Sequence, residues 1–312
     1  MNGGIRLSTA YIYVLITAVA FATLEPFGQL EALAGLSGMQ ITALRFAIGS
    51  VILLPFSIYQ LRKKHLSLSF RDLLILSGLG ILCICVSMSL LQQSVIVAKA
   101  ANASAANVAI IFCSNSLFTI LLSALFLREK MTRKKVVSVV LCAIGLVFCA
   151  DFSQEGTVSS SLLALMAAVT FSLYTVLSKK FSARFSGIIQ TGISFSIGTV
   201  VLIVFLACTG TNVMTNVNPG NIPHLLYMGV IITGLAYWSF FRSMELASAT
   251  VASYTFFIKP ILTPFAVWVI NGRAPDDWKL FVSIALIVAG SLVVTPLIPD
   301  RWFAGKGSPE NN

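Results

Sequence analysis

Charged residues are scarce in this chain of 312 residues. Asp, Glu, Lys and Arg together make up only 10% of the sequence, whereas hydrophobic residues make up 57%. An average soluble domain contains about 25% charged residues, because it has to cover its surface with polar groups. The composition therefore excludes a soluble globular protein and predicts a chain that lies mostly inside a membrane.

Sequence motifs that carry enzymatic or metal chemistry are also missing. The two histidines, His65 and His224, form no zinc-binding helix motif, and neither a nucleophile-elbow sequence nor a phosphate-binding glycine loop occurs. The six cysteines fall in or at the ends of apolar runs and include no Cys-x-x-Cys pair. We therefore expect no enzymatic activity, no metal site, no cofactor and no disulfide.

Long apolar runs, separated by short polar segments, fill the chain instead. A membrane-spanning helix needs about 20 apolar residues, so ten candidate runs use roughly 210 residues and leave no loop long enough for a second domain. These runs predict an all-α integral membrane protein with ten transmembrane helices, over residues 9–30, 38–60, 72–96, 104–127, 134–150, 160–178, 187–208, 222–242, 249–271 and 279–298.

The basic residues are divided unevenly between the two sides of this arrangement. With a cytoplasmic N-terminus, sixteen of the 21 Lys and Arg residues fall in cytoplasmic segments, three fall outside, and Arg45 and Lys259 lie within spans. Cytoplasmic loops of membrane proteins carry such an excess. We therefore predict a multi-pass protein of the cell (inner or plasma) membrane, with both termini and a polar tail over 299–312 in the cytoplasm. The net charge of +10 follows from this topology, and we expect no binding of nucleic acid.

An internal repeat is suggested by three short stretches that recur in the same order. The recurrences have shifts of 150, 149 and 145 residues, and they relate residues 18–22 to 168–172, 46–49 to 195–198 and 143–147 to 288–292. Because the repeat unit holds five spans, an odd number, the second copy enters the membrane from the opposite side. We predict two inverted five-helix repeats, over 1–150 and 151–298. Such folds place a substrate near the midplane between the repeats, although duplication is also compatible with a channel or a scaffold.

Three further stretches carry a family likeness. They are Leu44-Arg45-Phe46 followed by an apolar run to Pro55, the segment 127–132 leading to Gly145, and Ala247-Ser248-Ala249 before Lys259-Pro260. Together they resemble the drug/metabolite transporter superfamily, and within it the EamA-type transporters, over about residues 9–296. The resemblance implies ten helices in two inverted repeats and a role in transport. The sequence departs from the family pattern at two positions. In the family, the proline of the ninth span often has a counterpart in the fourth span, where this chain has Asn115. The acidic residue after the fourth span, here Glu129, often recurs after the ninth span, where this chain has Ala274.

The resemblance implies a transported small molecule but does not select it. We favour a secondary transporter of amino acids or related zwitterions that works by alternating access. The alternatives are phosphorylated or sugar-linked anions, small organic cations, or a membrane helper subunit without transport activity. The partners that we expect are the small-molecule substrate and the lipid bilayer, and the chain is predicted to be a monomer or a homodimer.

Three charged residues lie well inside predicted spans, away from the span ends, where a charge costs about 2.5–3.5 kcal/mol on insertion scales. Glu25 is predicted to bind a substrate ammonium or to couple transport to protons, the alternative being an ion pair that fixes helix packing. Arg45 is its natural partner, for which we expect a structural ion pair. Lys259 is expected to hold a carboxylate or phosphate, or else to be a counter-ion of Glu25. The neighbouring prolines are expected to break their helices at Pro26, Pro260 and Pro264.

Polar and aromatic residues complete the predicted site. Asn115 occupies the place in the fourth span that matches Pro260, with Asn107 two turns earlier, and Gln92 lies in the third span. Tyr174, Tyr237 and Tyr254 fall in the second repeat, and aromatic faces suit cations and flat rings. We expect all six to contact the substrate. The alternatives are that the amides join helices within lipid and that the tyrosines mark the membrane surface.

Overall fold

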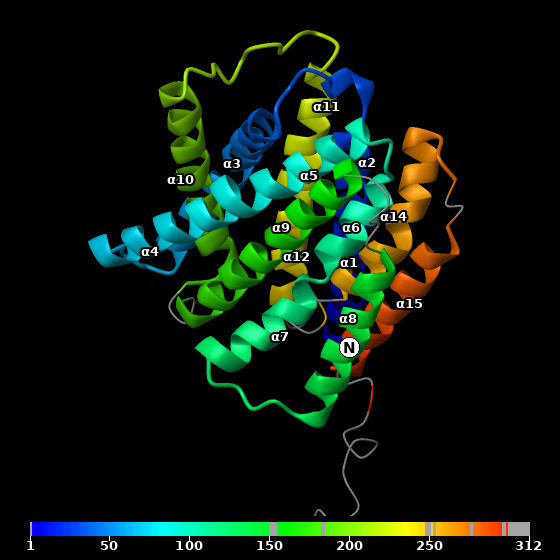
Figure 1. Cartoon of the computed structure of the whole chain (residues 1–312). Coiled ribbons are helices and arrows are strands. Elements are labelled where there is room, and N and C mark those ends of the chain that lie inside the picture. The colour runs from blue at the N-terminus through cyan, green and yellow to red at the C-terminus, as the bar shows by residue number, and fades with distance from the viewer. Residues whose placement is uncertain are drawn as a thin grey trace, which may run out of the picture.

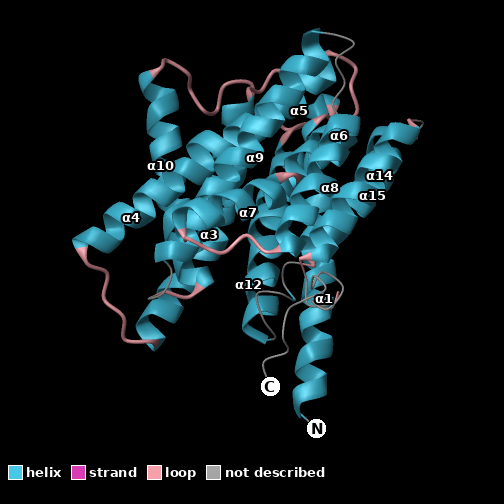
Figure 2. Ribbon diagram, turned by 60° about the horizontal axis from the view of Figure 1, so that its bottom comes forward, coloured by secondary structure: helices cyan, strands magenta, loops and turns pink. Residues whose placement is uncertain are grey.

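The computed structural model describes residues 2–149, 155–181, 185–246, 251, 254–274, 277–294 and 298, the side chains of residues 2–7 and 257 excepted. All regular structure within these ranges is helical (Figure 2). The predicted tail over 299–312 lies outside the described residues. So do residues 247–250, which hold the Ala247-Ser248-Ala249 stretch and the predicted start of the ninth span.

The helices follow one another with short connections (Figure 1). They are α1 (Asn2–Ala22), α2 (Leu24–Gly28), α3 (Gly38–Lys63), α4 (Phe70–Gly80), α5 (Ser89–Ala100), α6 (Ala105–Cys113), α7 (Asn115–Phe126), α8 (Arg133–Cys149), α9 (Glu155–Phe181), α10 (Gly187–Cys208), α11 (Ile222–Tyr227), α12 (Ala236–Leu246), α14 (Thr255–Asn271) and α15 (Trp278–Val293). A 3₁₀ turn, η1 (Glu31–Leu33), and two π-helical segments, η2 (Ile81–Met88) and η3 (Met228–Leu235), complete the order.

Seven helical stretches are long and apolar enough to cross a membrane. They are Ser8–Gly28, Gly38–Lys63, Phe70–Ala100, Ala105–Phe126, Glu155–Lys180, Gly187–Cys208 and Ile222–Leu246. The helices α8, α14 and α15, with 17, 17 and 16 residues, are shorter than the about 20 residues that usually span a bilayer. Helices occupy the described part of each of the ten predicted ranges. Ten complete crossings stay a prediction.

Polar residues at the helix ends explain where several helices begin. Ser37 accepts a hydrogen bond from the Gln40 amide, and the Gln40 side chain accepts one from the Ser37 amide, so α3 starts with a capping box. Ser69 and Asp72 form the same motif at the start of α4. The third helical stretch therefore begins at Phe70, two residues before the predicted start at residue 72. The prediction followed the apolar run and did not use the capping residue Ser69.

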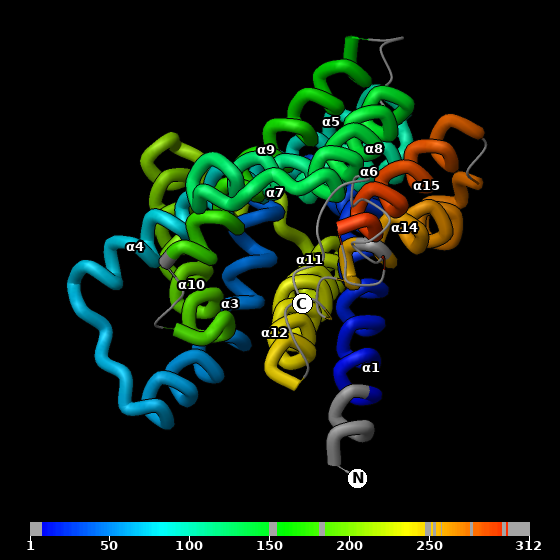
Figure 3. The backbone as a smooth tube through the Cα atoms, turned by 90° about the horizontal axis from the view of Figure 1, so that it is seen from below, coloured from blue at the N-terminus to red at the C-terminus, as the bar shows by residue number. Residues whose placement is uncertain are grey.

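The main helix pairs each join an element from residues 1–150 to one from residues 151–298. Most extensively packed are α1 with α12, α3 with α10, α5 with α9, and α8 with α15. Figure 3 shows α3, α4 and α10 on one side, α8, α14 and α15 on the other, and α1 and α12 between these groups. The two halves of the chain therefore interleave around one shared core.

Close helix contacts at glycines include two that lie at related positions in the two halves of the chain. A Cβ atom on Gly80 would overlap the Ser194 carbonyl oxygen beside Gly198, and one on Gly49 would overlap Thr233 beside Gly229. A shift of 149 residues relates the two contacts, since it takes Gly80 to Gly229 and Gly49 to Gly198. The π-helical segments η2 and η3 recur in the same way, with equal lengths of 8 residues. These spacings agree with the shifts of the sequence repeat.

Polar contacts gather the loops at two ends of the bundle. At one end, Lys99 lies 2.9 Å from Glu31, and Arg273 donates a hydrogen bond to the Asn102 carbonyl oxygen (2.9 Å). At the other end, Glu129 lies 2.7 Å from Lys135 and 2.9 Å from Lys179. These two lysines lower the pKa of the Glu129 carboxyl, through hydrogen bonds that favour its charged form. Loops predicted to share a side of the membrane therefore meet.

The glycine contacts lead to a stability prediction. Gly80→Ala is expected to destabilise the protein by about 1–3 kcal/mol, because the new methyl group overlaps backbone atoms of α10 that cannot move aside. Thermal unfolding of the purified protein in detergent measures the effect. Gly78→Ala is the matched control, since a Cβ there meets nothing within 4 Å. Equal melting temperatures for the two variants would contradict the prediction.

Candidate functional site

Three charged side chains are buried among the described residues, and they are the three that the sequence places inside spans. Glu25 is 0% exposed, Arg45 2% and Lys259 3%. A buried ion is stable only when other groups replace the water that it has lost. The contacts of these three residues therefore define the polar interior of the bundle.

Glu25 and Lys259 form a buried ion pair between α2 and α14. Lys259 Nζ lies 2.6 Å from Glu25 Oε1, a charge-assisted hydrogen bond between residues 234 positions apart in the chain. The ammonium group also lies 5.4 Å from the centre of the Phe112 ring of α6, within the range of a cation–π contact. One carboxylate oxygen, Oε2, has no hydrogen-bond partner among the described residues.

Arg45 does not pair with Glu25, and this expectation was wrong. The break at Thr23 and a hydrogen bond from Asn271 Nδ2 to the Pro26 carbonyl oxygen (3.3 Å) hold α2 against α14, so the carboxylate reaches Lys259. The Arg45 guanidinium lies instead 4.6 Å from the centre of the Phe46 ring. Its Nε and Nη2 atoms have no hydrogen-bond partner among the described residues.

The helix break expected near Pro26 occurs, but those expected at Pro260 and Pro264 do not. α1 ends at Ala22 and α2 begins at Leu24, one turn before the position of the proline ring. Pro260 and Pro264 lie inside the continuous helix α14. Around them the helix stays intact because neighbouring helices, α1, α6 and α15 among them, enclose it.

A break that the prediction missed lies in the fourth helical stretch, next to Asn115. α6 ends at Cys113 and α7 begins at Asn115, and the Ser114 hydroxyl donates to the Ile111 carbonyl oxygen (2.6 Å). Side chains of Ser and Asn compete with helix hydrogen bonds in this way, so the run Ser114-Asn115-Ser116 was the available signal. Asn115 is 7% exposed, and its side-chain amide makes no hydrogen bond within the described part of the chain.

Gln92 of α5 lies beside the ion pair's helix. A Cβ atom on Gly28 of α2 would come within 2.6 Å of Gln92 Nε2, so the amide touches the helix that carries Glu25. Gln92 is 1% exposed, and its Nε2 atom has no hydrogen-bond partner in the described ranges. The structure thus places Gln92 in the interior with a donor left unused, and its contact with a substrate stays a prediction.

Of the three predicted tyrosines, Tyr237 lies near Arg45, and Tyr174 lies near Tyr237. Arg45 is within electrostatic range of Tyr237, Cys83 and Glu25, and Tyr174 and Tyr237 are within range of each other. The Tyr237 ring packs edge-on against Phe195 and Phe21, at 4.9 and 5.2 Å between ring centres. The Phe46 ring beside the guanidinium is thus continuous with aromatic rings from both halves of the chain.

Two other predicted residues are not brought to this interior. Tyr254 stacks on Tyr11, with 6.4 Å between ring centres, and Tyr11 lies about 21 Å from the position of Glu25 along a helix at 1.5 Å per residue. Asn107 is half-buried, and its carbonyl oxygen accepts a hydrogen bond from the Cys149 thiol (3.6 Å). The tyrosine was assigned from its residue type alone, which cannot distinguish the centre of a span from its end.

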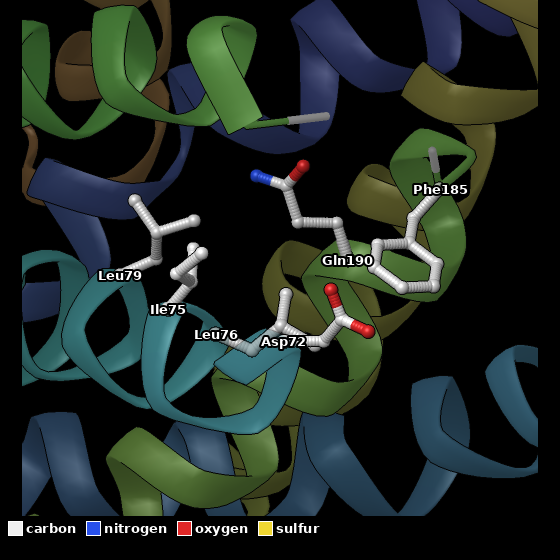
Figure 4. A pocket seen from close by; sticks show the side chains of 6 residues that line it. All are labelled: Asp72, Ile75, Leu76, Leu79, Phe185 and Gln190. Carbon is white, nitrogen blue, oxygen red and sulfur yellow. The ribbon is translucent and has the colours of Figure 1, made fainter. Parts of the chain in front are cut away.

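A small hollow between α4 and α10 is a different feature. Figure 4 shows Asp72, Ile75, Leu76, Leu79, Phe185 and Gln190 around it. Its volume of ≈ 20 Å³ leaves room for about one water molecule, far below the about 300–1,000 Å³ typical of ligand pockets. The Asp72 carboxylate is already bound to the Ser69 hydroxyl at 2.7 Å. We therefore place the candidate site at the buried charges and not here.

Comparisons with known proteins agree on one family. The model of the EamA-like transporter family matches the chain twice, over residues 8–150 and 158–295. An uncharacterized transporter of Clostridium kluyveri is 34% identical over 295 residues, which cover 92% of this chain and 93% of the relative. A riboflavin transporter of Vibrio cholerae is 23% identical over 309 residues, 96% of each chain.

A solved crystal structure shares the fold. It superposes with a TM-score of 0.65 over 95% of this chain and 99% of the other, at 18% sequence identity. At this level of identity the likeness concerns the arrangement of the helices and nothing about their chemistry.

The ion pair leads to a stability prediction. Lys259→Met is expected to destabilise the protein by about 3–5 kcal/mol, because it leaves the Glu25 carboxylate buried without its partner. The double variant Glu25→Gln/Lys259→Met is expected to recover most of this loss, since it removes both charges. Thermal unfolding in detergent of the wild type, both single variants and the double variant gives the coupling. Additive effects would show that the pair contributes nothing.

Proposed function

The chain belongs to the EamA-like transporter family of the drug/metabolite transporter superfamily, and from this we propose that it is a secondary transporter of small organic metabolites. It is a multi-pass membrane protein. The observation that carries the proposal is the buried Glu25–Lys259 pair, which joins helices from the two halves of the chain. A charge pair across two halves is a place where a charged cargo can enter and where movement of the halves can be controlled.

The helix arrangement supports two inverted repeats of five helices, over 1–150 and 151–298. The paired glycine contacts, the paired π-helical segments and the two matches of the family model all repeat at about 150 residues. With ten crossings, both termini lie in the cytoplasm, as the distribution of Lys and Arg indicates. Alternating access then consists of one repeat rocking against the other around the buried pair.

We infer that the favoured cargo is an amino acid or a related zwitterion. A zwitterion can enter the ion pair without changing its net charge, because its ammonium replaces Lys259 at Glu25 and its carboxylate replaces Glu25 at Lys259. Such an exchange offsets the cost of separating the pair, which would otherwise leave two buried ions unpaired. The unpartnered oxygen Oε2 of Glu25 and the Nε2 donor of Gln92 offer additional contacts.

The other cargo classes fit the interior less well. The three buried ions sum to one positive charge, which opposes a cation, and a phosphate dianion would exceed that charge by one. In a helper subunit without transport activity, the buried pair would only fix the packing of α2 against α14. The aromatic rings of Phe21, Tyr237 and Phe195 favour a second candidate, a flat aromatic compound such as the one that the Vibrio cholerae relative is named for.

Transport by the purified chain tests the cargo assignment. In proteoliposomes, Glu25→Gln and Lys259→Met are each expected to lower the uptake of a labelled amino acid about tenfold or more, because each removes a buried charged contact. The exposed Lys180 provides a matched control, and Lys180→Met should keep the wild-type rate. Riboflavin, a sugar phosphate and a quaternary ammonium serve as competing cargoes. Wild-type rates for both site variants would refute the assignment.

Proton coupling through Glu25 is the second part of this proposal. Among the described residues, the ionisable groups that interact with the carboxylate include Lys259 on α14, Cys113 on α6 and Arg45 on α3. Protonation of Glu25 frees Lys259, so a proton and a cargo ammonium compete for the same carboxylate. A pH gradient across the liposome is expected to change cargo accumulation in the wild type, and Glu25→Gln is expected to abolish that dependence. Equal accumulation with and without the gradient would rule out this coupling.

A further inference from the structure

Arg45 is the third buried charge, and it takes no part in the Glu25–Lys259 ion pair. It is 2% exposed, and within the described part of the chain the buried acid is Glu25, which already holds Lys259. A guanidinium at this depth normally finds a carboxylate or backbone carbonyl oxygens. Here Nε and Nη2 bind none among the described residues. A structural ion pair, the role expected from the sequence, therefore does not account for this residue.

The two unused donors lie on the same edge of the guanidinium. Nε and Nη2 point in parallel directions from the planar group, and this edge matches the two oxygens of a carboxylate. To bind both donors, a carboxylate needs two free oxygens. Glu25 does not have them, because its Oε1 is bound to Lys259. The arrangement of the two donors therefore fits a carboxylate of a bound molecule.

The surroundings of Arg45 suit part of a bound molecule. The guanidinium lies over the Phe46 ring at 4.6 Å, and Phe46 packs edge-on against Phe195 at 5.0 Å. Tyr237 lies within electrostatic range of Arg45, and Glu25 is also within this range. Because these aromatic groups keep water away, a carboxylate that reaches Arg45 gains a strong contact. Arg45 and Glu25 interact electrostatically, so both belong to the same buried polar region.

The charge balance points to the same ligand. The buried residues sum to one positive charge, and a zwitterion that enters the Glu25–Lys259 pair leaves this sum unchanged. A cargo with one additional carboxylate brings the sum to zero. Buried charge is expensive when uncompensated, so the neutral combination is the more stable one.

We propose that Arg45 binds a second carboxylate of the cargo and selects zwitterions that carry one extra negative charge, the chemistry of an acidic amino acid. This inference rests on the proposed function, because it assumes that the zwitterionic part of the cargo engages Glu25 and Lys259. Arg45 is then the residue that determines specificity, and the ion pair is the residue pair that accepts the common part of all cargoes.

Binding of matched pairs of compounds tests the proposal. Each pair consists of an acidic amino acid and its neutral amide, L-glutamate with L-glutamine and L-aspartate with L-asparagine, which differ in one carboxylate. The readout is the ratio of the two dissociation constants for the full-length protein in detergent, measured by isothermal titration. For the wild type we expect at least one pair in which the acid binds about tenfold or more tightly.

Substitution of Arg45 is expected to change that ratio in a defined order. Arg45→Met should bring the ratio to about one, and Arg45→Lys should give an intermediate value, because an ammonium lacks the two parallel donors. Arg242, which pairs with Glu245 at 3.0 Å on the surface of α12, supplies the control, since Arg242→Met should keep the wild-type ratio. Arg45→Lys also keeps the test valid if Arg45→Met does not fold.

The possible failures separate this inference from the proposed function. Binding of the neutral amides without preference for the acids overturns the role of Arg45 and leaves the transporter proposal intact. A preference that survives in both Arg45 variants overturns it as well. Failure of all four compounds to bind the wild type overturns the zwitterion proposal and this inference with it.

Discussion

Burying charge out of reach of water is the constraint on which the interior of this protein depends. Glu25 and Lys259 satisfy it by pairing at 2.6 Å across the boundary between the two halves of the chain. The short helix α2, the break at Thr23 and the contact of Asn271 with Pro26 serve to bring the carboxylate to α14. The pair thus links the position of α2 to that of α14, and a cargo that replaces either partner changes the contact between the halves.

Contacts between helices make this arrangement possible, because in lipid no hydrophobic force draws apolar helices together. Glycines bring backbones close where Gly80 meets α10 and where Gly49 meets η3. Hydroxyls contribute too: Ser89 and Thr233 each bond to the carbonyl oxygen five residues earlier, at 3.0 Å, which fits the wider turn of the π-helical segments. Close packing and local widening occur side by side around the buried charges.

The sequence predicts the order of the helices and all three buried charges, because runs of apolar residues and isolated ions are unambiguous signals. It does not predict which ions pair. Glu25 and Arg45 lie at similar depth, and only the sideways placement of α2 against α14 selects Lys259. Local rules failed in a similar way at Pro260 and Pro264, where surrounding helices keep α14 intact, and at Ser114, where a helix ends without proline. Tertiary packing decided each of these cases.

The interleaving of the two halves has a consequence for synthesis of the protein. Each main helix pair joins an early helix to a late one, and Lys259 follows Glu25 by 234 residues. At about 5–20 residues per second, a ribosome needs about 10–50 s to cover that distance. For that interval the nascent first half waits in the bilayer with an acidic group that has no final partner. Insertion of the ninth helical stretch is therefore the event that gives Glu25 its partner, and the first half alone is an incomplete folding unit.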